Sequence, residues 1–390
     1  MRRLIIFISL LLWSCAPSKA KIMVALPLEK SGLSYGIDAK NGVNLAVLDL
    51  GEKNITFSYC DTEGKAEKFN ECYENAKKEG VNIVIGPILT KEVDNKTIEL
   101  INKYKIPVIS PSITTDEIFN KSEYIFGVAA SNSIIAANLA YILSEAGVNE
   151  VIIIKDPNSE YSVDISEKEK KALNKYNITV VDEVNFRGSR TDLINDLKNS
   201  ISKFKKEQKA PVKTVKSKSK KEEEPKPSTK NAIIINTYAV DLDKILLDIR
   251  QELKYDGILA GPDAWDEIKE QAVQIPGENF YVAHFFPLEN KKTQEFFNKY
   301  KQQFNTIPSS WSALSYDALS IIINAIREAK AIETQRILLR MKYQDYNGLT
   351  GRISYGGDNK PDDKSVVIIK YTGDKKGFIR RTNVAGTIAQ

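Results

Sequence analysis

The chain has 390 residues, of which 42% are hydrophobic and 27% charged, a composition typical of a soluble globular protein of about two domains. The formal net charge of +5 is misleading, because Lys205–Lys230 contributes +6 and Arg2 with Arg3 another +2, which leaves −3 on the remainder. We therefore expect no basic face for a nucleic acid. The single histidine, His284, leaves little room for histidine catalysis or a histidine metal site.

The first residues have the layout of a secretory signal. After a charged start, the apolar run Leu4–Trp13 is too short to span a bilayer. The Leu-Trp-Ser-Cys that follows resembles a bacterial lipobox, although Trp13 departs from its usual pattern. We therefore expect removal of residues 1–14 and acylation of Cys15, which would anchor the chain on the periplasmic side of a membrane. An ordinary cleavage site at Ser18–Ala20 is the competing interpretation.

Short β-branched runs alternate with amphipathic segments along the first third of the chain. The predicted strands are Lys21–Leu28, Ile55–Cys60, Val81–Ile85 and Ile106–Ile109, and the helices between them are Ile37–Leu50, Lys65–Glu79 and Lys91–Tyr104. This order predicts a doubly wound α/β lobe with a parallel sheet.

Val81–Phe119 contains two strand–turn–helix units in succession. Each strand ends in a Gly-Pro or Ser-Pro turn, and Thr90 and Thr114 or Thr115 then stand at N-cap positions before acidic residues. Two neighbouring helix N-termini with hydroxyls would suit a small anion such as a carboxylate. Plain helix capping by both threonines is the alternative.

The α/β pattern restarts after Gly127. Predicted strands at Glu150–Ile154, Ile178–Val181, Ala232–Ile235 and Gly257–Ala260 alternate with helices at Asn132–Ala146, Ile165–Lys175, Asp192–Phe204 and Asp241–Leu253. Further on, we expect a crossing strand at Phe280–Pro287, helices at Lys291–Phe304, Ser312–Lys330 and Glu333–Met341, and two paired strands at Asn347–Tyr355 and Ser365–Tyr371.

Lys205–Lys230 interrupts this second lobe. It has no aromatic residue and three prolines, so it cannot bury enough apolar surface to offset its ordering entropy, and we expect a disordered basic loop. The segment is either a tolerated surface insertion or a tether to an anionic lipid, polymer or partner.

Cys60 and Cys72 remain as a pair if Cys15 is acylated. An exported chain can oxidise them to a disulfide, but two buried free thiols are an equal alternative.

Several short motifs, in this order and spacing, resemble type I periplasmic binding proteins of the branched-chain amino acid (Leu/Ile/Val) class, the receptors of ABC importers. The resemblance spans about residues 22–371. It rests on Tyr35-Gly36, Asn41-Gly42, Asp61–Gly64, Ile85–Pro87, Ile109–Ser112, Asp156-Pro157 with Tyr161, Gly261–Asp266, Ser315–Leu319 and Leu349–Ile353.

The resemblance implies two doubly wound parallel-sheet lobes joined by three crossovers. Lobe 1 would comprise residues 15–127 and 286–347, and lobe 2 would comprise residues 128–285 and 348–390.

The resemblance also implies ligand-binding residues by position. Thr90 and Thr114 would hold the ligand's carboxylate, the carbonyl of Ser112 and the side chain of Asp263 would accept from its ammonium, and Tyr35, Tyr161 and Tyr238 would line the side-chain pocket. Asp263 in place of Glu, Ser112 in place of a small apolar residue and Thr90 in place of Ser depart from many relatives, so a somewhat different ligand is plausible.

The expected function is that of an importer receptor that closes on an amino acid or similar zwitterion and delivers it to ABC membrane subunits, without a cofactor or metal. The alternative is an outer-membrane lipoprotein that uses the fold as a regulatory or protein-interaction module, such as an activator of cell-wall synthases. An enzyme is disfavoured, because the chain has no nucleophile elbow, P-loop, paired-histidine motif or nucleotide fingerprint.

Overall fold

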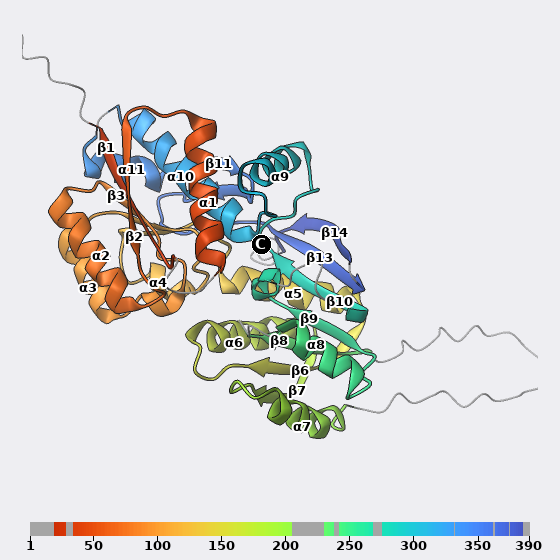
Figure 1. Cartoon of the computed structure of the whole chain (residues 1–390). Coiled ribbons are helices and arrows are strands. Elements are labelled where there is room, and N and C mark those ends of the chain that lie inside the picture. Colours follow the sequence, from red (N-terminus) through yellow and green to blue (C-terminus); the bar gives the residue numbers. More distant parts are fainter. Residues whose placement is uncertain are drawn as a thin grey trace, which may run out of the picture.

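The computed structural model describes residues 19–28, 34–204, 230–237, 242–267, 275–330, 332–361, 363–373 and 375–384. Cys15, Tyr238 and nearly all of the Lys205–Lys230 segment lie outside these residues. The described chain forms two α/β lobes that lie side by side (Figure 1).

Lobe 1 is built on a five-stranded parallel sheet in the order β2-β1-β3-β4-β5. Its strands are β1 (Ala20–Leu26), β2 (Ile55–Asp61), β3 (Ile83–Ile85), β4 (Val108–Ser110) and β5 (Ile125–Gly127). Its helices are α1 (Ser34–Leu50), α2 (Ala66–Glu79), α3 (Asn95–Tyr104) and the short α4 (Asp116–Phe119), joined by the later α9 (Lys291–Phe304), α10 (Ser310–Ala329) and α11 (Thr334–Lys342).

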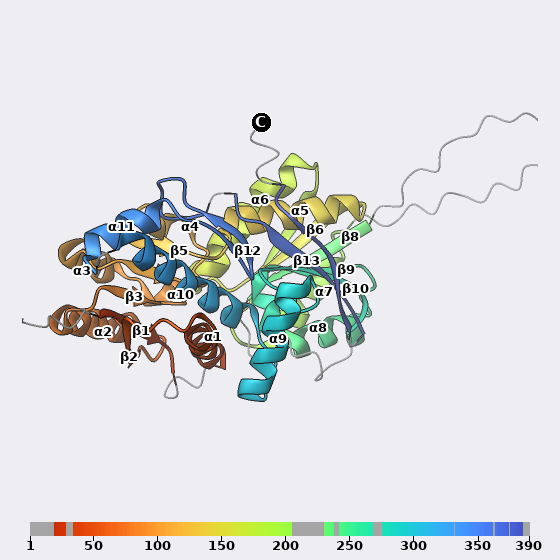
Figure 2. The ribbon, with the colours of Figure 1, turned by 90° about the horizontal axis from the view of Figure 1, so that it is seen from above.

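The helices α1 and α10 pack closely against each other although they are far apart in the sequence (Figure 2). Gly42 of α1 permits this approach, because a Cβ there would lie 2.0 Å from the carbonyl oxygen of Ser312. The chain therefore returns to complete lobe 1 after building most of lobe 2.

Lobe 2 has a seven-stranded sheet in the order β14-β13-β10-β9-β8-β6-β7. Its strands are β6 (Val148–Lys155), β7 (Thr179–Asn185), β8 (Lys230–Asn236), β9 (Ile258–Gly261), β10 (Ile275–Ala283), β13 (Val366–Gly373) and β14 (Lys375–Thr382). The first five run parallel to one another, β13 pairs antiparallel with β10, and β14 pairs antiparallel with β13.

Helices cover both faces of the lobe 2 sheet, and β8 shows why. Ala232 and Ile234 pack against α5 (Asn132–Glu145) and α6 (Glu160–Lys175), whereas Ile233 and Ile235 belong to the core beneath α7 (Arg190–Ile201) and α8 (Leu242–Gln251). Successive side chains of a strand point to opposite faces, so a wholly apolar strand needs a helix layer on each side.

The lobes are joined by three crossovers, between β5 and α5, between β10 and α9, and between the β11–β12 hairpin and β13. The predicted fold class is thus confirmed. The hairpin consists of β11 (Asp345–Gly348) and β12 (Gly351–Ser354), which pair with each other. The expected pairing of the Asn347–Tyr355 strand with Ser365–Tyr371 is therefore wrong.

The last crossover lies later than the expected Gly348. Ile353 and Tyr355 are buried in the lobe 1 core, and the Tyr355 hydroxyl donates to the carbonyl of Gly127 at 3.0 Å. The chain therefore enters lobe 2 only between Tyr355 and the start of β13.

Cys60 at the end of β2 and Cys72 in α2 form a disulfide, with a Cα–Cα distance of 5.9 Å. The sequence left open a disulfide or two free thiols, and the structure has the disulfide. Within the described part of the chain, none of the helices has the length and apolar character needed to cross a membrane.

Candidate functional site

The carboxyl ends of the parallel strands gather polar side chains in both lobes. In lobe 2, Asp263 follows β9 and His284 follows β10, and these two strands are neighbours in the sheet. In lobe 1, Thr90 follows β3, and Ser112 and Thr114 follow β4. In open α/β sheets, this edge is where ligands bind.

The carboxylate of Asp263 is buried and is held by two donors. The Tyr161 hydroxyl donates to its Oδ1 at 2.6 Å, and Nε2 of His284 lies 3.3 Å from its Oδ2. Tyr161 lies in the first turn of α6, which begins before the expected Ile165, because Ser159 caps that helix by accepting from the amide of Ser162. The structure thus brings two of the predicted site residues into direct contact and adds His284, which we had set aside.

The two threonines of lobe 1 do not begin long helices. Thr90 opens a three-residue 3₁₀ turn, η2 (Thr90–Glu92), and Thr115 precedes the four-residue α4. Helix α3 starts only at Asn95, because Asp94 accepts from the Thr97 amide at 2.7 Å and the Thr97 hydroxyl contacts Asp94 in return. The prediction that Thr90 caps a helix running to Tyr104 is therefore wrong, and Asp-x-x-Thr was the signal that it overlooked, whereas Thr115 does occupy the N-cap position of α4.

The threonine side chains nevertheless lie close together. The hydroxyls of Thr90 and Thr115 are 3.0 Å apart, and Thr90 and Thr114 are both buried. The carbonyl of Thr114 accepts from the amide of Asn132, which starts α5 in lobe 2. Ser112 is half-buried and its hydroxyl donates to the carbonyl of Ile88 at 2.9 Å. These contacts tie the loops after β3 and β4 into one unit.

A buried acid, Glu92, sits inside this unit and was not foreseen. Its Oε2 accepts from the amides of Ile88 and Leu89 at 3.2 and 3.0 Å, and its Oε1 accepts from the Thr62 hydroxyl. Burial raises the pKa of Glu92 to about 7 in spite of these hydrogen bonds. The amides of Ile88 and Leu89 are therefore used by the protein itself and not by an external anion.

Tyr35 lies in α1 and stacks on Trp311 of α10, with ring centroids 5.5 Å apart. The sequence analysis selected Tyr35 and missed Trp311, because the contact depends on α1 packing against α10. Tyr238 lies outside the described residues.

The two lobes touch along the edges that carry these residues. Helix α6 lies against η2. The amide of Ser310 in lobe 1 donates to Asp266 in lobe 2 at 3.0 Å, and Lys168 of lobe 2 forms an ion pair with Glu117 of lobe 1 at 2.9 Å. The structure therefore represents a closed arrangement in which Thr90 and Tyr161 belong to elements in contact.

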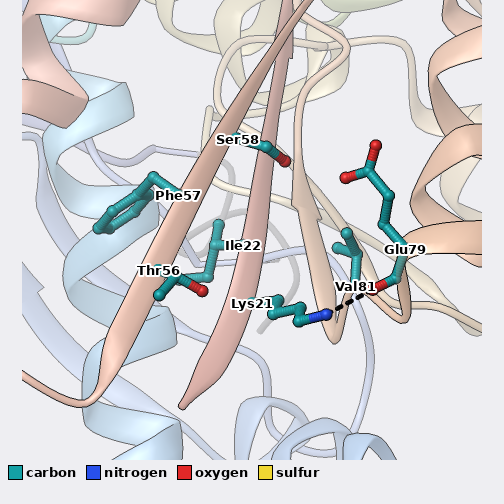
Figure 3. A pocket seen from close by; sticks show the side chains of 7 residues that line it. All are labelled: Lys21, Ile22, Thr56, Phe57, Ser58, Glu79 and Val81. Atoms are coloured by element: carbon teal, nitrogen blue, oxygen red, sulfur yellow. Dashed lines mark hydrogen bonds between the residues drawn. The ribbon is translucent and has the colours of Figure 1, made fainter.

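Two cavities among the described residues lie elsewhere. One of about 260 Å³ is found at the amino ends of β1 and β2 (Figure 3), where Lys21 already donates to the carbonyl of Glu79 at 2.7 Å. Another, of about 610 Å³, lies on lobe 2 beside the end of α6 and the start of β7. Neither is lined by a predicted site residue. We favour the carboxyl edges of the two sheets as the site. The space for a ligand between two lobes becomes smaller when the lobes close, so a small cavity there does not argue against this choice. Among the described residues, no group of three or more His, Cys, Asp and Glu side chains is placed to hold a metal ion.

Comparison with known proteins identifies the family and supports the fold. A sequence profile of the family described as periplasmic binding protein matches residues 21–376. The chain belongs to the periplasmic binding protein family. Members of this family bind small molecules, are not enzymes, and deliver their ligands to the membrane subunits of ABC transporters, which implies a periplasmic location for this binding protein.

Solved structures share the fold at low sequence identity. A leucine-binding protein from Thermotoga maritima is 22% identical, with a TM-score of 0.73 over 94% of this chain and 99% of its own. A branched-chain amino acid binding protein from Streptococcus pneumoniae, in complex with isoleucine, is 19% identical, with a TM-score of 0.72 over 93% and 99%.

A solute-binding protein from Rhodopseudomonas palustris, in complex with 3,4-dihydroxybenzoic acid, is 14% identical, with a TM-score of 0.76 over 94% of this chain and 97% of its own. None of the curated proteins compared with this binding protein matches it. At these identities the solved structures establish the fold and not the ligand.

Proposed function

We propose that this binding protein is the receptor of an ABC importer, anchored to a membrane by a lipid on Cys15, and that its lobes close on an amino acid or a similar small zwitterion. The contact between α6 and η2 is the observation that supports closure of the lobes most directly. It sets the lobe that carries Thr90 and Thr114 against the lobe that carries Tyr161 and Asp263.

In this proposal the ligand's carboxylate accepts from the hydroxyls of Thr90 and Thr114, and its ammonium donates to Asp263 and to the carbonyl of Ser112. Charge-assisted hydrogen bonds of this kind contribute about 1.5–3 kcal/mol each. Four of them, with burial of an aliphatic side chain, reach the roughly −8 kcal/mol of a micromolar ligand. Dividing the contacts between lobes makes the ligand favour the closed state.

The aromatic residues complete the proposed pocket. Tyr35, held against Trp311, would line it from lobe 1, and Tyr161 and Tyr238 from lobe 2. The ligands named for the solved relatives are leucine-type amino acids and an aromatic acid, which all carry a carboxylate. The amino acids carry an amine and the aromatic acid does not, so a test of the ligand class must vary the amine.

Calorimetry with the twenty amino acids, benzoate and 3,4-dihydroxybenzoate tests the ligand class. We expect at least one amino acid to bind with micromolar affinity, and Thr114→Ala and Asp263→Asn each to weaken it at least tenfold. Thr372→Ala and Asp196→Asn are matched controls, because both side chains are exposed in lobe 2 on β13 and α7. Unchanged affinity in both site variants would refute the proposed contacts. Tight binding of the aromatic acids alone would replace the amino acid as ligand, and no binding at all would favour the interaction module.

The anchor is tested by mass spectrometry of the mature protein's N-terminus. We expect an acylated Cys15 and release of a Cys15→Ser variant from the membrane. A mature chain that begins at Lys21 without acyl groups rules the anchor out.

A further inference from the structure

His284 is the chain's only histidine, and it is almost completely buried, with 2% of its surface exposed. It stands directly after β10, where the chain leaves lobe 2 for lobe 1. Its Nε2 contacts Oδ2 of Asp263, while the Tyr161 hydroxyl contacts Oδ1. Each oxygen of the carboxylate therefore has its own partner, which fixes the plane of the Asp263 side chain.

The histidine is itself held from its backbone. The guanidinium of Arg381 in β14 donates to the His284 carbonyl at 3.2 Å, and it forms two hydrogen bonds of 2.6 Å each with Glu289, further along the same crossover. Bidentate pairs of this kind have a defined geometry. The position of the imidazole is thus set by β14 and by the crossover rather than by Asp263 alone.

The buried position of His284 costs free energy of folding. Nδ1 of His284 is buried and has no hydrogen-bond partner among the described residues. A buried polar atom without a partner costs about 1–3 kcal/mol. An apolar residue at this place would avoid that cost, so the histidine is explained best by what it does to Asp263.

We propose that His284 is a positioning residue which, through Asp263, makes the site demand an amine on its ligand. This inference rests on the proposed function, in which Asp263 faces the ligand's ammonium. Tyr161 and His284 each occupy one hydrogen-bonding direction, the first at Oδ1 and the second at Oδ2 of Asp263. The remaining lone pairs of the carboxylate therefore keep a constant orientation. A ligand without N–H donors leaves that buried carboxylate unpaired, and sites of this type reject such analogues by large factors, on the order of 10⁴. Without His284, only Oδ1 of Asp263 is held, by Tyr161, so the carboxylate can turn about that contact and the rejection weakens.

The test compares a ligand with its deaminated analogue. L-Leucine and 4-methylpentanoate differ only by the amino group and are the first pair; if another of the twenty amino acids binds more tightly, it and its deaminated analogue replace them. For the wild-type protein we expect leucine to bind at least 100-fold more tightly by calorimetry. For His284→Leu we expect this ratio to fall at least tenfold, through weaker leucine binding with unchanged binding of 4-methylpentanoate. His284→Gln supplies an amide N–H to Asp263 and should restore most of the ratio.

The outcomes separate this inference from the proposed function. A large ratio in the wild type that persists in His284→Leu overturns the role of His284 and leaves the amino acid function standing. A wild-type ratio near one, or no binding by any amino acid, overturns both. A merely structural role of the histidine would weaken the two ligands equally.

A second measurement does not depend on folding of the variants. Because the untagged chain has one histidine, its imidazole ¹H–¹⁵N signals in an NMR spectrum belong to His284 without ambiguity. We expect leucine to shift them in the wild-type protein and 4-methylpentanoate to leave them in place at equal saturation. Identical shifts with both ligands would contradict the proposal.

Discussion

At the scale of single residues, burial determines how several acids behave. Glu169 of α6 is fully buried, and it accepts a hydrogen bond from the side-chain amide of Asn236 at the end of β8. Burial raises the pKa of Glu169 from its ordinary 4.5 to about 8, and this hydrogen bond offsets only part of that effect. Glu92 shows the same behaviour in lobe 1, so both acids keep a proton well above the pH at which an exposed glutamate loses it.

The pH dependence of stability tests this for Glu169. The folded state binds the proton of Glu169 more tightly than the unfolded chain does. The stabilising contribution of Glu169 is therefore complete below pH 4.5 and is lost as the pH rises towards 8. Over that range we expect Glu169 to account for a loss of about 4 kcal/mol, which Glu169→Gln removes, while the share due to Glu92 remains. Denaturant unfolding at pH 5 and pH 8 measures it. The exposed Glu67→Gln in α2 should leave the loss unchanged, and an equal loss in Glu169→Gln would contradict the assignment.

At the scale of elements, the lobes are joined at their rims by side chains outside the proposed ligand contacts. Lys168 of α6 pairs with Glu117 of α4 at 2.9 Å and also lies 3.7 Å from Asp164. Proximity to Lys168 lowers the pKa of Glu117 although desolvation opposes it, so the pair is attractive in the closed form. An ion pair between the lobes favours the arrangement in which it forms, before any ligand binds.

We expect Glu117→Gln to weaken ligand binding by about two- to fivefold at low salt, because partly exposed ion pairs contribute about 0.2–1 kcal/mol. The effect should shrink at 0.5 M salt, since screening already removes most of the attraction. Calorimetry at both salt concentrations measures it. Glu123→Gln is a close control, because the Lys342–Glu123 pair has similar exposure but lies within lobe 1. Equal effects of the two variants would show that the Lys168–Glu117 pair has no role in closure.

The disulfide connects β2, an edge strand, to α2, with a separation of 12 residues along the chain. Closing a loop of this size stabilises a protein by about 3 kcal/mol in the chain-entropy estimate. We expect Cys60→Ser combined with Cys72→Ala to lower the free energy of unfolding by that amount and to make stability insensitive to reductant. A titration of free thiols in the denatured, unreduced wild type should find neither Cys60 nor Cys72, and two reactive thiols would contradict the bond.

At the scale of the whole molecule, a buried polar cluster ties the two lobes at the last crossover. Asp317 of α10 accepts from the amides of Leu349 and Thr350 and from the Thr350 hydroxyl, at 2.7–2.9 Å. The ammonium of Lys364, just before β13, donates to the carbonyl and the hydroxyl of Thr350. Gly348 is required here, because a Cβ would lie 2.4 Å from the Asp317 carboxylate.

We expect Asp317→Ala to lower the free energy of unfolding by about 3–5 kcal/mol, because it leaves two amides and a hydroxyl without their acceptor and removes the negative charge that faces the buried Lys364 ammonium. Asp317→Asn keeps an acceptor and should cost less. Denaturant unfolding measures both, with Asp196→Ala on the exposed face of α7 as the control. A loss below 1 kcal/mol for Asp317→Ala would show that the cluster does not hold the crossover.

The sequence by itself determined the architecture, because runs such as Ile152–Ile154 and Ile233–Ile235 are fully apolar and are stable only as strands covered on both faces. The resemblance of short motifs to a known family brought out Tyr161 and Asp263, and the cysteine count brought out Cys60 with Cys72. Their contacts are not local. Only the tertiary structure decided that Tyr161 and His284 hold Asp263, that Glu92 uses the amides beside Thr90, and that Tyr355 belongs to lobe 1. The physical reason is that these residues are separated by many positions along the chain, so the free energy of their contacts depends on how the sheets and helices pack.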